Sequence, residues 1–290
     1  MFTSPKNLIV LTDHLTPEIL TCMADMCGKT PETYSGHCCF RHIRDTKELR
    51  QKLFSFAQEH VLDMAILSPN TKLTNFRAVF FDMDSTLVNS ETLDEIASIH
   101  GVGKECAAIT AGAMSGRIKD YADSLRKRVA LLSGQSAQSI DMVWNRMRPN
   151  AGAEQFIQTS HRLGLNTYIV SSGFTVLTEK MRQKLGMTAT CANRIEIVNG
   201  RYTGRVFGPT DETILDASGK LMFVSRTMTE LGLDPSMAIC CGDGSNDIRM
   251  IDAAGIGVGF RPKAILQPHC DVVLNNRGFE GLLMLIDAQI

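Results

Sequence analysis

The sequence predicts an α/β protein in which helices cover both faces of a mostly parallel sheet. Five short apolar runs lie between residues 78 and 274, and helical patterns separate them. This alternation is typical of a parallel sheet. In addition, the first crossover is unusually long, and a separate strand and helix pattern precedes the first run. We therefore expect an α/β core with an inserted helical subdomain and a small N-terminal α+β unit.

The composition is that of a folded globular protein. The chain has 290 residues, of which 44% are hydrophobic and 21% are charged, a balance that excludes a disordered or fibrous chain. At roughly 150 residues per domain, the length predicts about two domains. The net charge of −1 argues against a nucleic-acid partner and against a polybasic membrane-binding surface.

Two features predict a cytoplasmic location. The apolar run before Asp13 is too short for a secretory leader, and the chain lacks the roughly 18 consecutive apolar residues that a membrane helix needs. The 9 cysteines are an odd number and are scattered without a Cys-x-x-Cys pair. We therefore expect reduced thiols rather than disulfides.

Residues 1–70 form the first predicted unit. Its strands are expected at Asn7–Thr12, Cys38–Arg41 and Asp63–Leu67. One helix begins at Thr16, which is followed by proline, and ends at Gly28. A second begins at the pair Asp45 and Glu48, which resembles a capping box, and runs through His60. The polar stretch from residue 68 to residue 75 is the predicted linker.

Residues 76–290 form the second predicted unit, the α/β core. Each apolar run predicts a buried parallel strand, and the runs are Ala78–Phe81, Thr167–Val170, Met237–Cys241, Ile256–Val258 and Val272–Leu274. A plain crossover needs only about a dozen residues. The helical patterns at about residues 90–150, around Leu93 and over Tyr121–Leu132 and Ser136–Trp144, therefore predict an inserted subdomain. A helix over Glu154–Leu163 then leads into the second strand.

A second insertion has the pattern of a hairpin. Arg194–Val198 and Arg201–Val206 are joined by Asn199-Gly200. Because Asn-Gly favours the type I′ turn, we expect two antiparallel strands there.

Polar residues follow three of the predicted core strands. Asp82 and Asp84 come directly after the first strand, and Ser171 comes after the second. The run ending at Cys241 continues into Gly-Asp-Gly-Ser-Asn-Asp, residues 242–247. Ligands of open α/β sheets bind at the carboxyl ends of the strands. We therefore expect these side chains at one edge of the sheet.

Four carboxylates at that edge predict a divalent cation. Asp82, Asp84, Asp243 and Asp247 would repel one another without one, and ligand sets made only of oxygen suit Mg²⁺. A carboxylate beside the ion can attack phosphorus, and a neighbouring carboxyl can protonate the leaving oxygen. The pattern therefore predicts phosphoryl chemistry.

Three ordered motifs resemble those of the haloacid dehalogenase-like phosphatases. They are FDMDSTLVNSE, VSSGF and GDGSND, and their combination is far more specific than an isolated Asp-x-Asp. DMDSTLVNSETLDEIA, SLRKRV and DASGK bring the resemblance closer, to the phosphoserine phosphatases of that family. The resemblance covers residues 76–275. It implies a Rossmann-like core with a helical cap, and hydrolysis of O-phospho-L-serine as the last step of serine biosynthesis.

The resemblance also implies a role for each matching residue at the phosphate end. Asp82 would be the nucleophile and Asp84 the general acid and base. Ser171 and the amide of Ser172 would hold the phosphoryl oxygens, and Lys220 would neutralise charge. The implied Mg²⁺ ligands are Asp82, the Asp84 backbone carbonyl and Asp243, with Asp247 behind them.

At the other end of the substrate, Glu91 would meet the ammonium group and Arg128 the carboxylate, which a guanidinium can bind bidentately. Met114 and Tyr121 would belong to the cap wall that excludes water. The remaining substrate-binding residues of this set are Ser172, Gly173 and Asn246. Ser172 stands where the family commonly has Gly, and Tyr121 stands where Phe is usual.

The pattern of residues 1–70 is compatible with βαββαβ and resembles an ACT-like regulatory module, which accompanies some phosphoserine phosphatases. The turn at residues 13–16 lacks the glycine expected where a backbone cradles an amino acid. A dimerisation module and a purely structural module are equal alternatives, so the sequence leaves a homodimer open.

The sequence thus predicts a cytoplasmic, Mg²⁺-dependent phosphomonoesterase with a small-molecule substrate and no nucleic-acid or membrane partner. Two alternatives stay open. One is a phosphatase for another small ester, such as phosphoethanolamine or phosphohomoserine, and the other is a non-catalytic metabolite sensor. The pair Glu91 and Arg128 favours an amino-acid head group. A sensor would be expected to lose the nucleophile or a metal ligand, and both are present.

Overall fold

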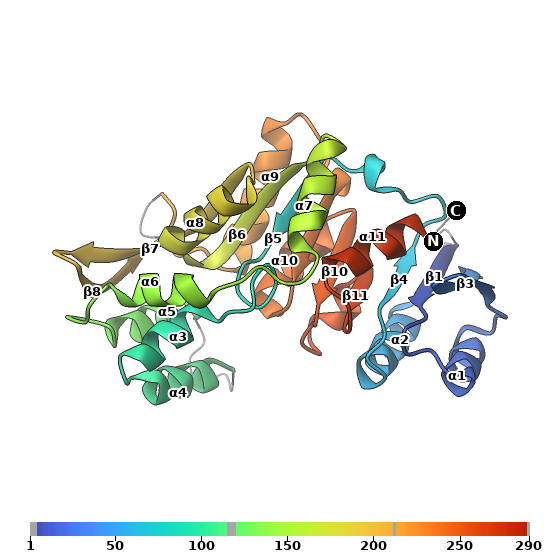
Figure 1. Ribbon diagram of the computed structural model, residues 1–290, viewed down its shortest axis with the longest axis horizontal. Helices are drawn as coiled ribbons and strands as arrows, with labels where there is room; N and C mark the ends of the chain where they lie inside the picture. The colour runs from blue at the N-terminus through green and yellow to red at the C-terminus, as the bar shows by residue number, and fades with distance from the viewer. Residues whose placement is uncertain (1–4, 115–119, 211–212, 289–290) are drawn as a thin grey trace.

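The computed structural model describes residues 5–114, 120–210 and 213–288. Its strands are β1 (Lys6–Leu11), β2 (Glu32–Tyr34), β3 (His37–Ile43), β4 (Met64–Leu67), β5 (Ala78–Phe81), β6 (Asn166–Phe174), β7 (Ala189–Val198), β8 (Arg201–Phe207), β9 (Ala238–Gly242), β10 (Ile256–Phe260) and β11 (Val272–Leu274). They form one sheet in the order β2-β3-β1-β4-β11-β10-β9-β5-β6-β7-β8. The N-terminal strands lie at one end of this sheet and the β7–β8 hairpin at the other (Figure 1).

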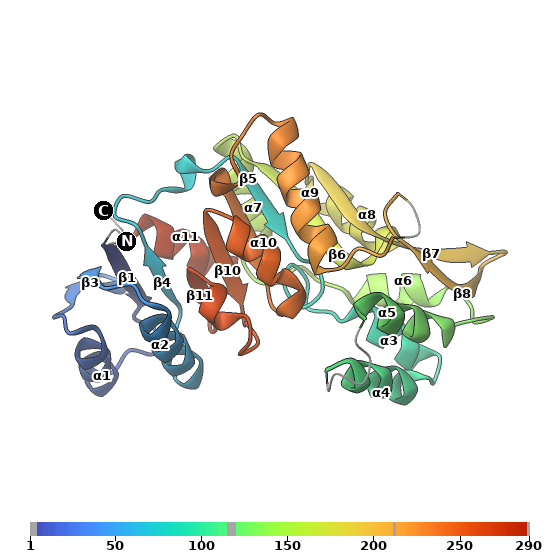
Figure 2. The same cartoon turned by 180° about the vertical axis from the view of Figure 1, so that it is seen from behind.

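The helices are α1 (Pro17–Cys27), α2 (Lys47–Glu59), α3 (Thr92–Ile99), α4 (Gly103–Met114), α5 (Tyr121–Ala130), α6 (Ser139–Arg146), α7 (Ala153–Arg162), α8 (Thr175–Leu185), α9 (Ala217–Glu230), α10 (Ile248–Ala253) and α11 (Phe279–Asp287). α7, α8 and α11 pack on one face of the core sheet (Figure 1). α9 and α10 pack on the other face and stand in front in the reverse view (Figure 2). Each helix in the described part of the chain is too short or too polar to cross a membrane.

The predicted parallel core is confirmed. β5 lies between β9 and β6 and runs parallel to both, with Phe81 opposite Cys241 on one side and Ile169 on the other. β9, β10 and β11 continue the parallel arrangement. Phe81 also packs edge-on against Phe156 of α7 and Phe279 of α11, so this strand contacts two of the three helices of that face. In-register parallel strands bring their carboxyl ends to one edge, which is where the polar segments begin.

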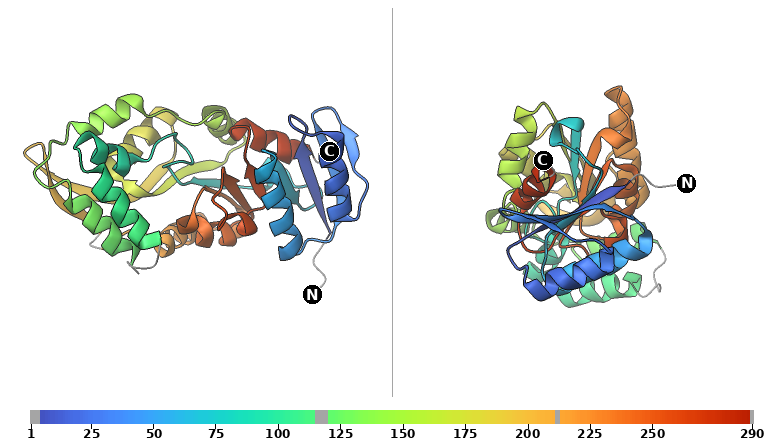
Figure 3. Two further views of the ribbon diagram at one scale, coloured as in Figure 1. Left: turned by 90° about the horizontal axis from the view of Figure 1, so that it is seen from below. Right: turned by 90° about the vertical axis from the view of Figure 1, so that its right-hand side faces the viewer.

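Helices α3 to α6 form the predicted cap between β5 and α7, and the cap lies at the far end of the molecule from the N-terminal unit (Figure 3). The sequence did not single out α4. The predicted hairpin is also confirmed, and Asn199 and Gly200 both have positive φ, as a type I′ turn requires. This hairpin packs on the cap: the Gly134 N–H donates to the Tyr202 carbonyl (2.8 Å), and the hydroxyls of Ser139 and Tyr202 lie 2.8 Å apart.

The N-terminal unit has the element order βαββαβ and the strand order β2-β3-β1-β4, all antiparallel. This is the connectivity of a ferredoxin-like fold. Its last strand, β4, pairs antiparallel with β11 of the core. The sheet of the N-terminal unit therefore continues directly into the sheet of the core. Helices α1 and α2 bury their apolar sides in the same hydrophobic cluster as α9 and α10.

Two local expectations for the N-terminal unit need correction. The N-cap of α2 is Thr46, whose hydroxyl accepts the N–H of Leu49, and Asp45 instead pairs with Arg50 at 2.7 Å. Strand β2 was not predicted, because its three residues are all exposed and show no apolar alternation. The caps of α1 are as predicted, with Thr16 at its start and Gly28 in the left-handed conformation at its end. All nine cysteines are free thiols.

Candidate active site

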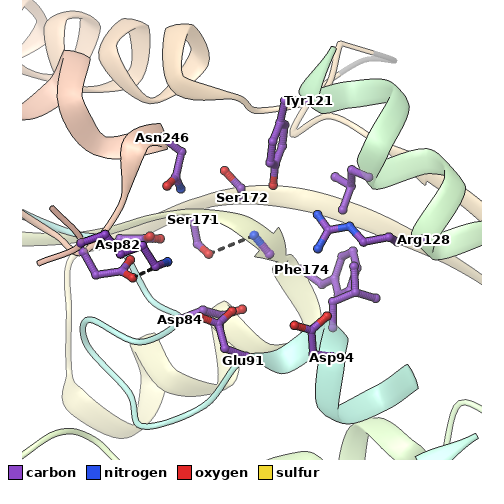
Figure 4. Close-up of a pocket in the computed structure, with 15 residues that line it drawn as sticks. Asp82, Asp84, Glu91, Asp94, Tyr121, Arg128, Ser171, Ser172, Phe174 and Asn246 are labelled. Carbon is purple, nitrogen blue, oxygen red and sulfur yellow. Dashed lines mark hydrogen bonds and ion pairs between the residues drawn. The ribbon is translucent and has the colours of Figure 1, made fainter. Parts of the chain in front are cut away.

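A cavity of about 110 Å³ lies where the carboxyl edge of the sheet meets the cap. Core and cap both line it, as the close-up in Figure 4 shows. The lining residues that the sequence predicted for the site are Asp82, Asp84, Glu91, Tyr121, Arg128, Ser171, Ser172, Gly173, Asp243 and Asn246. The structure therefore brings together segments that are up to 164 positions apart, from residue 82 to residue 246.

Asp82 and Lys220 form a buried ion pair directly beneath the cavity. Lys220 Nζ lies 2.8 Å from Asp82 Oδ1 and 2.7 Å from Asp247 Oδ1, and the lysine is fully buried. Burial alone would lower the pKa of Lys220, but the two carboxylates outweigh it and raise that pKa. Lys220 therefore stays charged. It can hold Asp82 in place and offset negative charge on the cavity floor.

Asp247 organises the loop after β9. Its Oδ2 accepts the backbone N–H groups of Asp243 and Gly244, both at 3.1 Å, and Lys220 occupies its other oxygen. A Cβ on Gly242 would lie 2.4 Å from the Asp247 carboxyl carbon, so only glycine lets this side chain fold back so closely. Asp247 is fully buried and does not line the cavity.

Asp82, Asp243 and Asp247 fit a hard divalent cation. Each offers a carboxylate oxygen, and the three oxygens lie within 4.8 Å of one another. Only oxygen donors are present in this cluster, which suits Mg²⁺ rather than a softer metal. Lys220 and Lys263, the latter 2.8 Å from Asp243, neutralise only part of this charge. The donor chemistry therefore agrees with the predicted metal.

Asp84 has two unlike oxygens. Oδ2 accepts the backbone N–H of Thr92 at 3.1 Å and its hydroxyl at 2.7 Å. Oδ1 is buried and has no hydrogen-bond partner among the described residues. Burial is the largest influence and raises the pKa of Asp84 to about 7, although the Thr92 hydrogen bonds oppose the rise. A carboxyl with this pKa can donate and accept a proton near neutral pH.

Ser171 to Gly173 present polar groups to the cavity because β6 leaves its regular pairing there. The register between β6 and β7 shifts between Ser171 and Phe174. The hydroxyl of Ser171 accepts the N–H of Gly173 at 3.0 Å, which orients it at the cavity wall. A shift of this kind frees backbone groups from the strand ladder, so that they can face a ligand. Ser172 lines the cavity with its neighbours, so the family's usual glycine is not needed for this placement.

Charges of both signs also line the cavity. Glu91, just before α3, lies beside Asp84, whereas Asp94 of α3 and Arg128 of α5 lie further from it (Figure 4). The Ser85 hydroxyl donates to Glu91 at 2.7 Å. Arg128 Nε is buried without a hydrogen-bond partner in the part of the chain that the structure describes. The cavity can therefore take an anion at Arg128 and a cation at Glu91.

Three of the predicted residues differ in where they lie relative to the cavity. The Tyr121 hydroxyl points into the cavity from the start of α5 (Figure 4). Met114 is the last residue of α4, and its side chain lies outside the described residues. Lys220 does not line the cavity and acts on it through Asp82.

Several residues that line the cavity or contact its lining were not predicted from the sequence. Lys263 follows the carboxyl end of β10, so the strand-end rule that identified Asp82 could have identified it as well. Asp94 lies three positions after Glu91 and therefore on the same helix face, which is also a sequence signal. The role of Thr92 could not be read from the sequence, because its contact with Asp84 depends on the turn between them.

The comparisons with known proteins agree with this geometry. The profile of the haloacid dehalogenase-like hydrolases matches residues 79–252. The chain belongs to this family of hydrolases. Membership of the haloacid dehalogenase-like family confirms the predicted enzyme class and the predicted Rossmann-like core. Phosphatases of the family generally depend on Mg²⁺.

Two relatives with similar sequences are both named phosphoserine phosphatase. The chain is 41% identical over 222 residues to a phosphoserine phosphatase from Polaromonas, a match that covers 76% of this chain and 94% of the relative. It is 35% identical to a phosphoserine phosphatase from Methanocaldococcus jannaschii, covering 72% and 97% of the two chains. These relatives support the resemblance that the motifs indicated.

Solved structures give the same picture. A substrate-bound phosphoserine phosphatase is 34% identical, with a TM-score of 0.65 over 72% of this chain and 97% of that one. A haloacid dehalogenase family hydrolase from Salmonella enterica serovar Typhi has a TM-score of 0.82 over 98% of this chain and 100% of its own, at 23% identity. The second match shows that the fold of the whole chain, N-terminal unit included, recurs in another protein.

Proposed function

We propose that this protein hydrolyses O-phospho-L-serine to L-serine and phosphate. The observation that carries the proposal is that one cavity holds two kinds of group. Asp82 and Asp84 supply phosphoryl chemistry, and Glu91 and Arg128 offer complementary charges for an amino-acid head group. The names of the relatives and of the substrate-bound structure support the same substrate.

The proposed reaction has two steps. The Asp82 carboxylate attacks phosphorus while Asp84 gives its proton to the departing serine oxygen, which leaves an aspartyl-phosphate on Asp82. Asp84, now ionised, then takes a proton from the water that attacks this intermediate, and phosphate is released. Lys220 and Ser171 stabilise the negative charge of the phosphoryl oxygens, Lys220 by its positive charge and Ser171 by its hydroxyl.

We assign the metal to Asp82, the backbone carbonyl of Asp84 and Asp243, with Asp247 holding the loop behind them. When bound, Mg²⁺ supplies positive charge to the phosphoryl oxygens and lowers the repulsion between phosphate and carboxylates. Lys220 alone cannot do this, because Asp82 and Asp247 already share its charge. We also keep the prediction of a cytoplasmic location, which the free thiols support.

Arg128 would select the carboxylate of the substrate, and Glu91, held by Ser85, would select its ammonium group. Phosphoethanolamine lacks the carboxylate, and phosphohomoserine is one methylene longer. We therefore expect both to react more slowly than phosphoserine.

The test is phosphate release from a panel of phosphoserine, phosphoethanolamine and phosphohomoserine, with Mg²⁺ and after treatment with EDTA. We expect phosphoserine to have the highest kcat/KM, activity to disappear with EDTA, and Mg²⁺ to restore it. Preference for either other ester would overturn the substrate assignment. Full activity in metal-free buffer would overturn the metal assignment.

A further inference from the structure

Thr92, which no part of the proposed reaction uses, makes the only side-chain hydrogen bond to Asp84 that the structure records among the described residues. Thr92 is the first residue of α3 and is fully buried. Its hydroxyl and its backbone N–H both donate to Asp84 Oδ2, at 2.7 and 3.1 Å. The first helix of the cap is therefore joined at its N-terminus to the proposed acid.

These two donors make the oxygens of Asp84 chemically different. An oxygen that accepts an N–H and an O–H is a poor place for a proton, because a proton there would face two donor hydrogens. Oδ1 accepts nothing from the described residues and is shielded from solvent. Oδ1 is therefore the free oxygen of this carboxyl, and Oδ2 is the oxygen that fixes its orientation.

We infer that Thr92 is a positioning residue that holds the Asp84 carboxyl by Oδ2 and so fixes the orientation in which this acid meets the leaving group. The inference rests on the proposed function, because it concerns the same acid. The hydrogen-bonded pair lies against Gly173, where a Cβ would be in ordinary van der Waals contact with both Asp84 Oδ2 and the Thr92 hydroxyl, at 3.6 Å.

The test compares substrates that differ in their need for a proton. Serine leaves poorly without one, whereas p-nitrophenol leaves well as an anion. Thr92→Val keeps the shape and the backbone N–H but removes the hydroxyl. We expect kcat/KM for phosphoserine to fall roughly 10- to 150-fold, the value of one hydrogen bond to the negative charge that Asp84 acquires as it gives up its proton. The loss should lie in kcat, with KM nearly unchanged, and p-nitrophenyl phosphate should lose less than about threefold.

Two further variants separate positioning from structure. Thr92→Ser restores the hydroxyl and should recover most of the phosphoserine activity. Thr86 is a matched control, because it is equally buried in the loop between β5 and α3 and its hydroxyl has no partner among the residues described. Thr86→Val should leave the ratio of the two activities unchanged.

Equal losses of Thr92→Val on both substrates, or a Thr92→Ser variant as poor as Thr92→Val, would overturn the inference. So would a Thr92→Val variant with full phosphoserine activity. If the wild-type protein does not act on phosphoserine at all, the proposed substrate fails by itself. The same variants are then measured on the alkyl ester that the wild type does accept, and the same two outcomes decide the role of Thr92.

Discussion

Two carboxyls with raised pKa values, the buried Asp63 at the junction with the N-terminal unit and the partly buried Asp84 at the cavity, differ in their hydrogen bonds. Burial raises the pKa of both. Asp63 accepts three consecutive backbone N–H groups, from Asn275 and Asn276 on Oδ1 and from Arg277 on Oδ2, at 2.7 to 2.9 Å. Asp84 accepts two donors on one oxygen and none on the other among the residues described.

The difference separates a structural carboxylate from a reactive one. Buried polar atoms are normally satisfied, because an unpaired one costs about 1–3 kcal/mol. Asp63 follows that rule and closes the loop that leads from β11 into α11. Asp84, which lines the cavity, breaks it at Oδ1. An unsatisfied oxygen in a cavity is therefore a better guide to chemistry here than burial or a raised pKa.

The largest effect is expected at the proposed nucleophile. Asp82→Asn should lower turnover by about 10⁴-fold or more, because a neutral amide cannot attack phosphorus. Folding should survive, since Lys220 keeps its ion pair with Asp247. Phosphate release and thermal unfolding of the same sample measure both effects. Turnover within tenfold of wild type would show that Asp82 is not the nucleophile.

At the junction the loss should appear in stability instead. Asp63→Ala leaves three buried N–H groups without their acceptor, and we expect the free energy of unfolding to fall by about 3 kcal/mol or more. Asp63→Asn retains one acceptor oxygen and should lose about half as much. Urea unfolding measures both variants, and kcat of the folded protein should stay near wild type. An unchanged unfolding midpoint for Asp63→Ala would remove the contrast with Asp84.

A smaller, substrate-selective effect is expected at the head-group end. Arg128→Ala should lower kcat/KM for phosphoserine by roughly 10- to 150-fold, and that for p-nitrophenyl phosphate far less, because only phosphoserine has a carboxylate. Lys127→Ala is the control, since Lys127 is exposed on the same helix and pairs with Asp123. Equal losses of Arg128→Ala on both substrates would place Arg128 at the phosphate instead.

The smallest effect is the pH dependence near neutrality. Asp84 must be protonated to donate, and its pKa is raised to about 7. Above that pH the protonated fraction falls about tenfold per unit, so kcat/KM for phosphoserine should fall with it. With p-nitrophenyl phosphate the decline should be shallower, because its leaving group needs little acid help. A pH profile equally steep for both esters would show that the loss of the Asp84 proton does not cause the decline.

The sequence predicted those parts of the molecule that depend on short patterns. Strand ends placed Asp82, Ser171 and Asp243 at one edge, since each directly follows an apolar run. Asn199-Gly200 predicted the hairpin because the turn chemistry is local. Lys220 came only from the resemblance to a family, as nothing in its own surroundings in the sequence marks a fully buried lysine.

Contacts between distant segments could not be predicted in this way. The pairing of β4 with β11 joins residues about 208 positions apart, Ala65 and Val272 among them, and no local pattern encodes it. Strand β2 is polar and exposed, and only its neighbour β3 makes it a strand. The contact of Thr92 with Asp84 depends on the intervening turn, in which Ser85 takes a positive φ of 56°.

The most direct test of the account is to trap the intermediate in Asp84→Asn with p-nitrophenyl phosphate. This leaving group departs without an acid, but the aspartyl-phosphate then lacks its base. We expect a burst of about one equivalent of p-nitrophenol followed by a slow steady state. Acid quench should recover phosphate bound at Asp82, and hydroxylamine should release it. A variant that binds Mg²⁺ normally but gives neither burst nor trapped phosphate would contradict the division of roles between Asp82 and Asp84.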